Sequence, residues 1–325
     1  MGGMIDLLLD AEAIGLRVVC ACERGWGDAV KSGPGIIWLG VHTQGPIPID
    51  GLDDFDMLLT VQAGAPAPWV SLTDIEAGIA HLRDVIAQQP LAATVLAQVL
   101  RITPMLEFDF AILLESFAYS TLLASGGFRR WLGALPPQRT RSDNHPRVRM
   151  QRTGEGLEII FDRPRGRNAI DAAMRDALVE ALQFASFDPD RAPVVLRAEG
   201  AVFSIGGDLA DFGRADDPAI AHAIRTLRSA ASALHSIADR ATTRLHGPCV
   251  GAGIEIPAAA ARVVARPGTS FRLPEVTMGV IPGAGGTVTI PRRIGRQRSC
   301  WMAMSGETID LETACRWGLV DAVDE

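Results

Sequence analysis

Two glutamates in apolar surroundings are the residues of this sequence best suited to proton-transfer chemistry. Glu255 lies in the segment GIEIPAAAA at 253–261, and Glu275 lies in FRLPEVTM at 271–278. A carboxyl group in apolar surroundings is costly to ionise, so we expect a raised pKa for both. Two such groups that converge on one cleft can divide the roles of acid and base. Each glutamate alone also fits a plainer role, as a charge at a helix end or as a salt-bridge partner.

Three glycine-rich turns occur where predicted strands lead into helices. They are FSIGGDL at 203–209, HGPCVGAGIE at 246–255 and LPEVTMGVIPGAGGT at 273–287. Glycine allows the backbone to approach a ligand closely, and a helix start leaves N–H groups without intrahelical partners. Pro257 is tolerated only in the first turn of a helix, so the N–H groups near Ala252 should be free. Two such turns facing each other would offer paired donors to a developing oxyanion.

The second half of the chain alternates strands and helices, which is typical of a parallel sheet covered by helices. We predict strands at 147–152, 157–161, 193–199 and 241–245, and helices at 171–184, 218–237 and 253–264. The glycine-rich turns fall at the junctions of these elements.

The first half of the chain has strands first and helices after them. Three apolar runs bounded by glycine and proline are predicted strands, at 16–22, 35–41 and 55–61. A capping box of Thr73 and Glu76 predicts one helix start, and Pro90 predicts the next. A third apolar helix is predicted at 106–123 and would end at Gly126. No motif in this half indicates a particular chemistry.

A polar, proline-rich and basic segment separates the two halves. It spans 135–146 and has no apolar periodicity, so we predict a linker there. The linker divides the chain into a mixed α/β, helix-rich N-terminal domain at 1–134 and an α/β domain at 147–325.

The composition excludes several classes of protein. The 325 residues carry a formal net charge of -7 and a pI near 5.4, which argues against a nucleic-acid platform because such proteins are usually basic. No apolar run is long enough to span a membrane, and the first residues lack a secretory signal. Five cysteines without a C-x-x-C pair favour a reducing compartment, so we expect a cytoplasmic protein. The six histidines are scattered, and no metal-ligand cluster is expected.

Five motifs stand in order along the second half of the chain. They are RPRGRNA at 163–169, FSIGGDL at 203–209, GAGIE at 251–255, FRLPEVTMGVIPGAGGT at 271–287, and a closing segment with SGE at 305–307 and ACRWGLVD at 314–321. In this order and spacing they resemble the crotonase (enoyl-CoA hydratase/isomerase) superfamily. The resemblance implies the family's ββα spiral fold for about 147–325. Crotonases usually continue with C-terminal helices that cover the acyl-CoA. We expect the helices between Thr73 and Trp131 to substitute for them, in the same or a neighbouring subunit.

The resemblance implies acyl-CoA chemistry at particular positions. The N–H groups of Gly207 and Ala252 would form an oxyanion hole for a thioester carbonyl, although the family usually has glycine at the second position. Glu255 and Glu275 match the two catalytic glutamates of the hydratases. A hydratase adds water to a 2-enoyl-CoA with syn stereochemistry, or removes it from a 3-hydroxyacyl-CoA. Glu255 would take a proton from water, and Glu275 would deliver one to C2. No metal or separate cofactor is implied, since coenzyme A is part of the substrate, and fatty acid metabolism is the expected context.

The resemblance also implies contacts with coenzyme A and self-association. The CoA-binding candidates are Arg163, Arg165, Arg167, Ser204, Ile205 and Asp208. Each of the three arginines also fits an ordinary solvated surface charge. We expect a homo-oligomer, a trimer or hexamer, with no nucleic-acid or membrane partner. Three alternatives remain open: isomerase activity, aromatic acyl-CoA dioxygenase activity, and a non-catalytic acyl-CoA-binding or assembly subunit.

Overall fold

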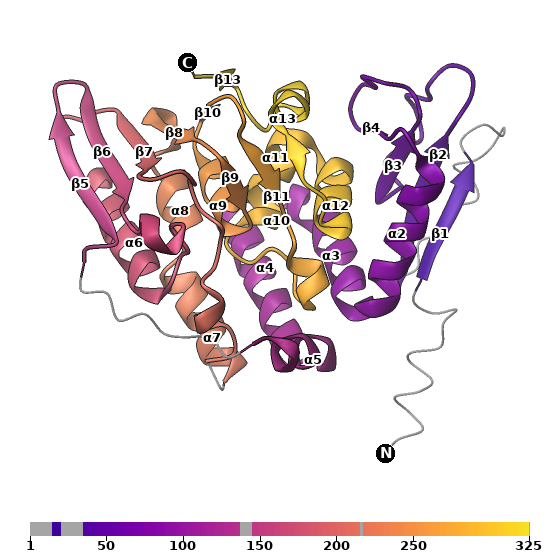
Figure 1. Ribbon diagram of the computed structural model, residues 1–325, viewed down its shortest axis with the longest axis horizontal. Coiled ribbons are helices and arrows are strands. Elements are labelled where there is room, and N and C mark those ends of the chain that lie inside the picture. The colour runs from indigo at the N-terminus through magenta and orange to yellow at the C-terminus, as the bar shows by residue number, and fades with distance from the viewer. Residues whose placement is uncertain (1–14, 21–34, 137–144, 215–216, 325) are drawn as a thin grey trace.

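A six-stranded sheet forms one side of the molecule (Figure 1). The computed structural model describes residues 15–20, 35–136, 145–214 and 217–324. The sheet order is β13-β10-β8-β7-β6-β5, and only the hairpin of β5 (Val148–Thr153) and β6 (Gly156–Phe161) is antiparallel. The parallel strands are β7 (Val194–Ala198), β8 (Ala241–Leu245), β10 (Arg262–Ala265) and β13 (Ala322–Val323). All four strands predicted in this half are confirmed.

A second sheet of three short strands lies where the glycine-rich turns meet. β9 (Pro248–Val250) pairs in parallel with β11 (Ser270–Arg272), which pairs antiparallel with β12 (Ile309–Asp310). An isolated bridge from Ser204 to Cys249 joins the first turn to the same sheet. β9 leads into α9 (Ala252–Glu255), and β11 leads toward the 3₁₀ helix Glu275–Met278. Both candidate glutamates therefore follow adjacent parallel strands.

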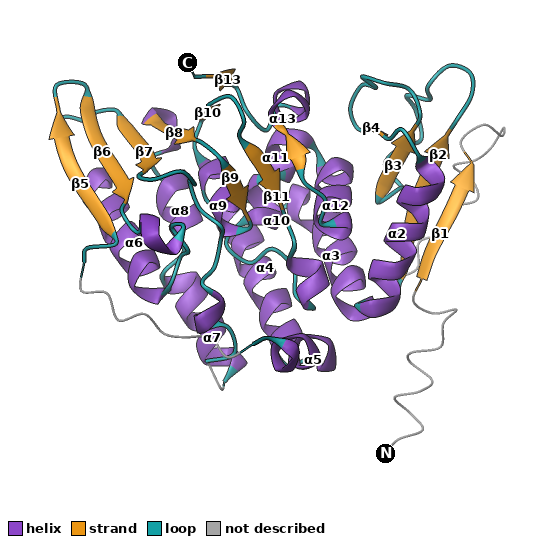
Figure 2. Cartoon of the chain, in the orientation of Figure 1, coloured by secondary structure: helices purple, strands orange, loops and turns teal. Residues whose placement is uncertain are grey.

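Helices pack around both sheets (Figure 2). Besides α9, those of the second half are α6 (Ala172–Ser186), α7 (Pro218–Leu227), α8 (Ala230–His235), α10 (Gly286–Thr289), α11 (Pro291–Ile294), α12 (Arg296–Ser305) and α13 (Leu311–Trp317). α6 confirms its prediction, because Asp171 caps it and Met174, Leu178 and Leu182 bury one helical face. Among the described residues, no single helix has the length and apolar character needed to cross a bilayer, although two bent helix pairs pass that test together.

Two predicted helices of this half are wrong in their extent. The helix predicted at 218–237 is divided into α7 and α8, because the Ser229 side chain accepts the N–H of Ser232 and starts a new helix. The helix predicted at 253–264 ends at Glu255. Pro257 then begins a 3₁₀ turn, since proline cannot donate the N–H that a continuing helix needs. From Arg262 onward the chain pairs with β8 as β10.

The first half forms a four-stranded parallel sheet followed by four helices. The strands, in sheet order, are β1 (Gly15–Cys20), β2 (Ile36–His42), β3 (Met57–Thr60) and β4 (Val70–Ser71). The helices are α2 (Ile75–Gln88), α3 (Pro90–Ile102), α4 (Phe108–Leu123) and α5 (Gly126–Ala134). The three predicted strands are confirmed, apart from residues 21 and 22, which lie outside the described residues. Pro90 begins α3 as predicted.

Two helix ends in this half differ from their predictions. The N-cap of α2 is Asp74, whose carboxylate accepts the N–H of Ala77 at 2.9 Å, so the capping box predicted at Thr73 is wrong by one residue. Gly126 begins α5 rather than ending α4, because Ser125 caps the new helix by accepting the N–H of Phe128.

One hydrophobic core runs through both halves of the chain. It unites Leu96 of α3 and Ile112 of α4 with Phe161 of β6 and Met302 of α12. α4 packs against α7 and α10, and α3 packs against α12 (Figure 1). The division at 135–146 stays a prediction, and 137–144 lie outside the described residues. The shared core places α4 beside the segment that follows Glu275.

Candidate active site

Glu255 is a buried carboxyl group at the end of α9. The helix follows Gly251, whose φ of 51° is a backbone conformation that favours glycine. Glu255 is only 2% exposed, and its Oε2 accepts the N–H groups of Ala284 and Gly286 at 2.8 and 2.9 Å. Its other oxygen, Oε1, accepts neither of these N–H groups.

Glu275 lies across from Glu255 and is 8% exposed. It begins the 3₁₀ helix after Pro274, and its buried Oε2 has no hydrogen-bond partner among the described residues. A Cβ atom placed on Gly251 would overlap Glu275 Oε1 and would lie 3.7 Å from Glu255 Oε1. The two carboxyl groups therefore border one small space, and Gly251 leaves that space open.

The N–H groups of Gly207 and Ala252 lie beside these acids. A Cβ atom placed on Gly206 would be 3.5 Å from the Ala252 nitrogen, so the turn at 206–207 packs against the start of α9. Ile170 donates to the Gly206 carbonyl and accepts from Asp208, which leaves the intervening N–H of Gly207 out of this pairing. Within the described part of the chain, neither the Gly207 nor the Ala252 N–H donates to another protein group. The structure brings these four predicted residues to one place.

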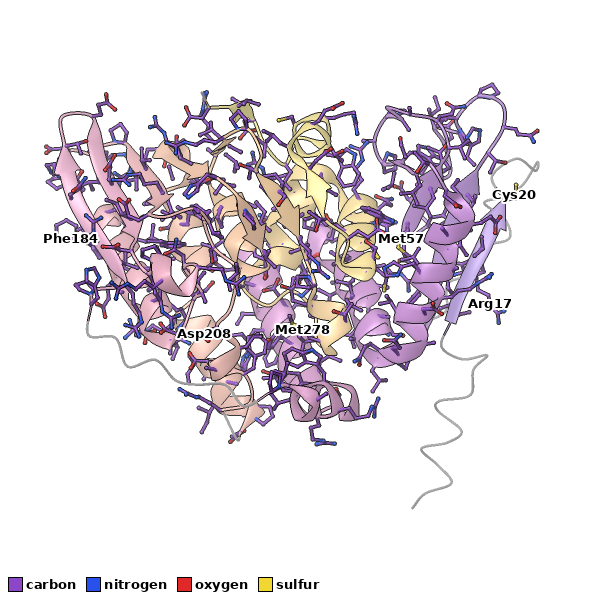
Figure 3. The ribbon with its side chains drawn as sticks, viewed as in Figure 1. Arg17, Cys20, Met57, Phe184, Asp208 and Met278 are labelled. Carbon is purple, nitrogen blue, oxygen red and sulfur yellow. The ribbon has the colours of Figure 1, made fainter. Side chains whose placement is uncertain are left out.

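All four residues line one cavity of about 620 Å³. Its volume is in the range of pockets that bind small organic ligands. Helices α4 and α5 of the first half form one wall, through Ile112, Tyr119, Leu123, Phe128 and Leu132. The expectation that helices between Thr73 and Trp131 cover the site is confirmed for these two helices, within the same chain. Figure 3 labels Asp208 and Met278, which mark the two segments that carry Gly207 and Glu275.

Burial dominates the electrostatics of the two glutamates. Burial and the negative charges of Glu275 and Glu115 raise the pKa of Glu255 well above its ordinary value, against the effect of its two N–H donors. Burial raises the pKa of Glu275 to about 8, with Glu115 adding to the effect and Arg272 opposing it. A carboxylic acid with such a pKa keeps its proton at neutral pH and can donate it.

The raised pKa of Glu275 predicts that stability falls as pH rises. Its pKa is about 8 in the folded chain against an ordinary value of 4.5, so unfolding releases its proton between these two pH values. This contribution to the free energy of unfolding is complete below pH 4.5 and is lost as pH approaches 8. Thermal unfolding of the wild type should show a steeper decline of Tm over this range than E275Q. Equal slopes for the two proteins would contradict the raised pKa.

The six CoA-binding candidates lie mostly outside the cavity. Only Asp208 lines it. The Arg163 guanidinium donates to Asp208 at 2.6 Å and to the Ala169 carbonyl at 2.7 Å, and Ser204 is buried and donates to the Asn168 carbonyl. These three candidates shape the loops around Gly207. Of the other three, Arg165 and Arg167 are exposed and Ile205 is half-buried. Their contacts with coenzyme A stay predictions.

Sequence reasoning missed three residues of α4 and α7 that line the cavity. They are Glu115, Tyr119 and Arg225, and the Arg225 guanidinium lies 4.5 Å from the centre of the Tyr119 ring. Glu115 lies in the apolar segment AILLESFA at 111–118. The criterion that selected Glu255, an acid within an apolar helix, would have selected it as well. Tyr119 and Arg225 carry no comparable signal in the sequence.

Comparison with known proteins decides the family. A sequence model of the family described as enoyl-CoA hydratase/isomerase matches residues 153–325. The chain belongs to the enoyl-CoA hydratase/isomerase family. Residues 1–152 lie outside that match.

The relatives of this enoyl-CoA hydratase/isomerase family member include a protein named as a hydratase and one named as an isomerase/hydratase. The 2,3-dehydroadipyl-CoA hydratase of Escherichia coli (strain K12) is 33% identical over 167 residues, which cover 51% of this chain and 65% of that protein. The enoyl-CoA isomerase/hydratase fer4 of Mycosarcoma maydis is 29% identical over 174 residues, covering 51% of this chain and 64% of that protein. The chain thus spans slightly less than two thirds of these relatives.

A solved structure confirms the fold of the family region. The crystal structure of the enoyl-CoA hydratase from Thermoplasma volcanium GSS1 matches with a TM-score of 0.51 and 30% sequence identity, covering 55% of this chain and 72% of that one. The second half of the chain therefore has the crotonase-like α/β fold. That likeness covers about half of the chain.

Proposed function

We propose that this protein is an enoyl-CoA hydratase, which adds water to a 2-enoyl-CoA or removes it from a 3-hydroxyacyl-CoA. One observation carries the proposal: two buried carboxyl groups border one small space, beside two N–H groups that have no protein acceptor among the described residues. The family membership supports acyl-CoA chemistry at this site.

The proposed reaction assigns each group a step. The thioester carbonyl accepts the N–H groups of Gly207 and Ala252, each of which stabilises the developing oxyanion by about 3 kcal/mol. Glu255, as a carboxylate, takes a proton from water while the water oxygen bonds to C3. Glu275, as a carboxylic acid, gives its proton to C2 on the same face. The proton on Glu255 then passes to Glu275, either directly or by release to solvent with uptake of another proton by Glu275, so the proton count balances. Burial raises the pKa of both glutamates, so the pair can hold one proton at neutral pH. The two N–H donors to Glu255 Oε2 favour Glu255 as the carboxylate and leave the proton to Glu275.

A screen of acyl-CoA thioesters tests this proposal. Purified protein is incubated with crotonyl-CoA and longer 2-enoyl-CoAs, and mass spectrometry follows the gain of one water. Gain of water is the expected result. Conversion of 3-enoyl-CoA to 2-enoyl-CoA without hydration would establish an isomerase instead. Oxygen incorporation into an aromatic acyl-CoA would establish a dioxygenase. Tight binding without any turnover would leave the non-catalytic alternative.

We also propose that the protein forms a homo-oligomer, a trimer or hexamer, through α4 and α7. Large apolar side chains are exposed on both helices, namely Phe110, Leu113 and Phe117 on α4 and Ile220, Ile224 and Leu227 on α7. The two faces adjoin, because Phe117 stacks on His222 with ring centres 4.0 Å apart. Exposed apolar area of this kind is typical of interaction sites.

Light scattering checks the proposed oligomer. The wild type should have the mass of three or six chains, and Leu227→Asp should lower it, because a buried unpaired charge is costly at an interface. Phe187→Asp is the matched control, since Phe187 is also a highly exposed apolar residue but lies after α6. A monomeric wild type, or equal loss of mass in both variants, would contradict this surface.

A further inference from the structure

Glu115 holds the segment that follows the 3₁₀ helix of Glu275. Its Oε1 accepts the N–H of Gly285 at 2.7 Å. Its Oε2 accepts the N–H and the hydroxyl of Thr287 at 2.8 and 2.7 Å. Glu115 is 2% exposed, so these three donors provide its solvation in place of water. Among the described residues, the Glu115 carboxyl group therefore accepts hydrogen bonds from Gly285 and Thr287 alone.

The same segment holds Glu255 through its other two N–H groups. Ala284 and Gly286 donate to Glu255 Oε2, so the four successive N–H groups of 284–287 alternate between the two glutamates. A φ of 110° at Gly285 allows this alternation, and a side chain there would be strained. The position of Glu255 thus depends on a backbone that Glu115 fixes from the opposite side.

Glu115 comes from a part of the chain outside the family match. It lies on α4, whereas the family model matches residues 153–325. It also lines the cavity together with Glu255 and Glu275. The first half of the chain therefore contributes a carboxyl group to the site as well as an apolar wall.

We propose that Glu115 is a positioning residue for the reaction: by holding Gly285 and Thr287 it keeps Glu255 aimed at the space it shares with Glu275. This inference rests on the proposed function, because its first test measures the rate of hydration. Without Glu115, three buried donors would lack an acceptor, and a buried unsatisfied donor drives local rearrangement. Displacement of a reacting group by about 1 Å can lower a rate about 100-fold.

Glu115→Gln tests the proposal with little change of shape. We expect kcat for hydration to fall about 10- to 100-fold with KM changed less than about 3-fold, because the substrate pocket persists while the base is misplaced. Asp56→Asn is the matched control. Asp56 is also a buried carboxyl group, 1% exposed, which accepts the Trp38 N–H and binds Arg101 outside the cavity. D56N should lower Tm and leave kcat per folded molecule unchanged.

A pH profile separates positioning from a purely structural role. The charged and titratable groups that face Glu115 are Glu255, Glu275, Arg225 of α7 and Tyr119 of its own helix. Burial raises the pKa of Glu115 to about 7, so its negative charge is present above neutral pH. E115Q removes that charge from beside Glu255 and Glu275, so both should lose their protons at lower pH. The high-pH limb of the kcat/KM profile should move to lower pH in E115Q and stay in place in D56N. Infrared titration of the carboxyl groups reads the same shift without turnover.

Two results would overturn the proposal. One is an E115Q protein with wild-type kcat and an unmoved titration. The other is loss of activity only in proportion to the unfolded fraction, as in D56N. If E115Q fails to fold, Thr287→Val removes a single donor to Glu115 and should still lower kcat severalfold; a wild-type kcat in T287V would count against the proposal. A wild type without any hydration would reject the proposed function alone, because the infrared titration still tests Glu115.

Discussion

Replacement of Glu275 by Gln is expected to lower kcat for hydration of a 2-enoyl-CoA by about 10³-fold, with the Kd for the acyl-CoA nearly unchanged. The amide is close in shape to the acid but cannot deliver a proton to C2, and general acid catalysis of this kind contributes about 10²- to 10⁴-fold. Glu275 Oε2 has no hydrogen-bond partner among the described residues, so the substitution breaks no bond at that atom. Loss of kcat should therefore occur without loss of stability.

Steady-state kinetics and calorimetric titration with an acyl-CoA measure this result. Glu312→Gln is the matched control, because its side chain is 85% exposed and lies on α13. E312Q should behave as the wild type in both measurements. A kcat for E275Q within about 3-fold of the wild type would remove Glu275 from the mechanism. Weakened binding with an unchanged kcat would instead indicate a role in substrate binding.

Replacement of Gly251 by Ala is expected to abolish most of the activity. The new Cβ would overlap Glu275 Oε1 and approach Glu255 Oε1, so it would occupy the space between the acids where water must sit. We expect kcat to fall at least about 100-fold, because a displaced carboxyl group loses its alignment. Backbone strain adds a separate cost of about 1–3 kcal/mol in stability, since φ at this position is 51°.

Gly268→Ala isolates the strain from the overlap. Gly268 has a φ of 82°, and a Cβ atom placed on it would have no neighbour within 4 Å. G268A should therefore lose a similar amount of stability and keep its kcat. Tm and kcat of both variants are measured side by side. Equal kcat values for G251A and G268A would show that the space beside Gly251 is not where the chemistry occurs.

Sequence reasoning identified most readily the residues whose role follows from their residue type and their spacing along the chain. Gly251, Ala252 and Glu255 stand within five residues of one another, so local backbone geometry places them together before any long-range contact forms. Strands such as β7 were predictable for the same reason, because alternating burial is a local pattern. The distance between Glu255 and Glu275 was not local, and only the pairing of β9 with β11 set it.

Errors arose where two local signals competed. Asp74 and Thr73 both suit an N-cap, and the structure decided for Asp74 through its bond to Ala77. The apolar run at 218–237 fits one helix by periodicity, yet Ser229 offers its own cap and divides the run. Periodicity reports which face is apolar, but it does not report where a side chain replaces a backbone acceptor.

The amino-acid sequence alone determined the carboxyl groups, the glycine-rich turns and the family, because these depend on residue type and spacing along the chain. Only the tertiary structure decided that α4 forms a wall of the cavity and that Glu115 binds the backbone at 285 and 287, 170 or more residues away. The physical reason is that a buried acid does not specify its donors. The donors of such an acid depend on which helix packs against the site. Packing of the shared core across the whole molecule determines that helix.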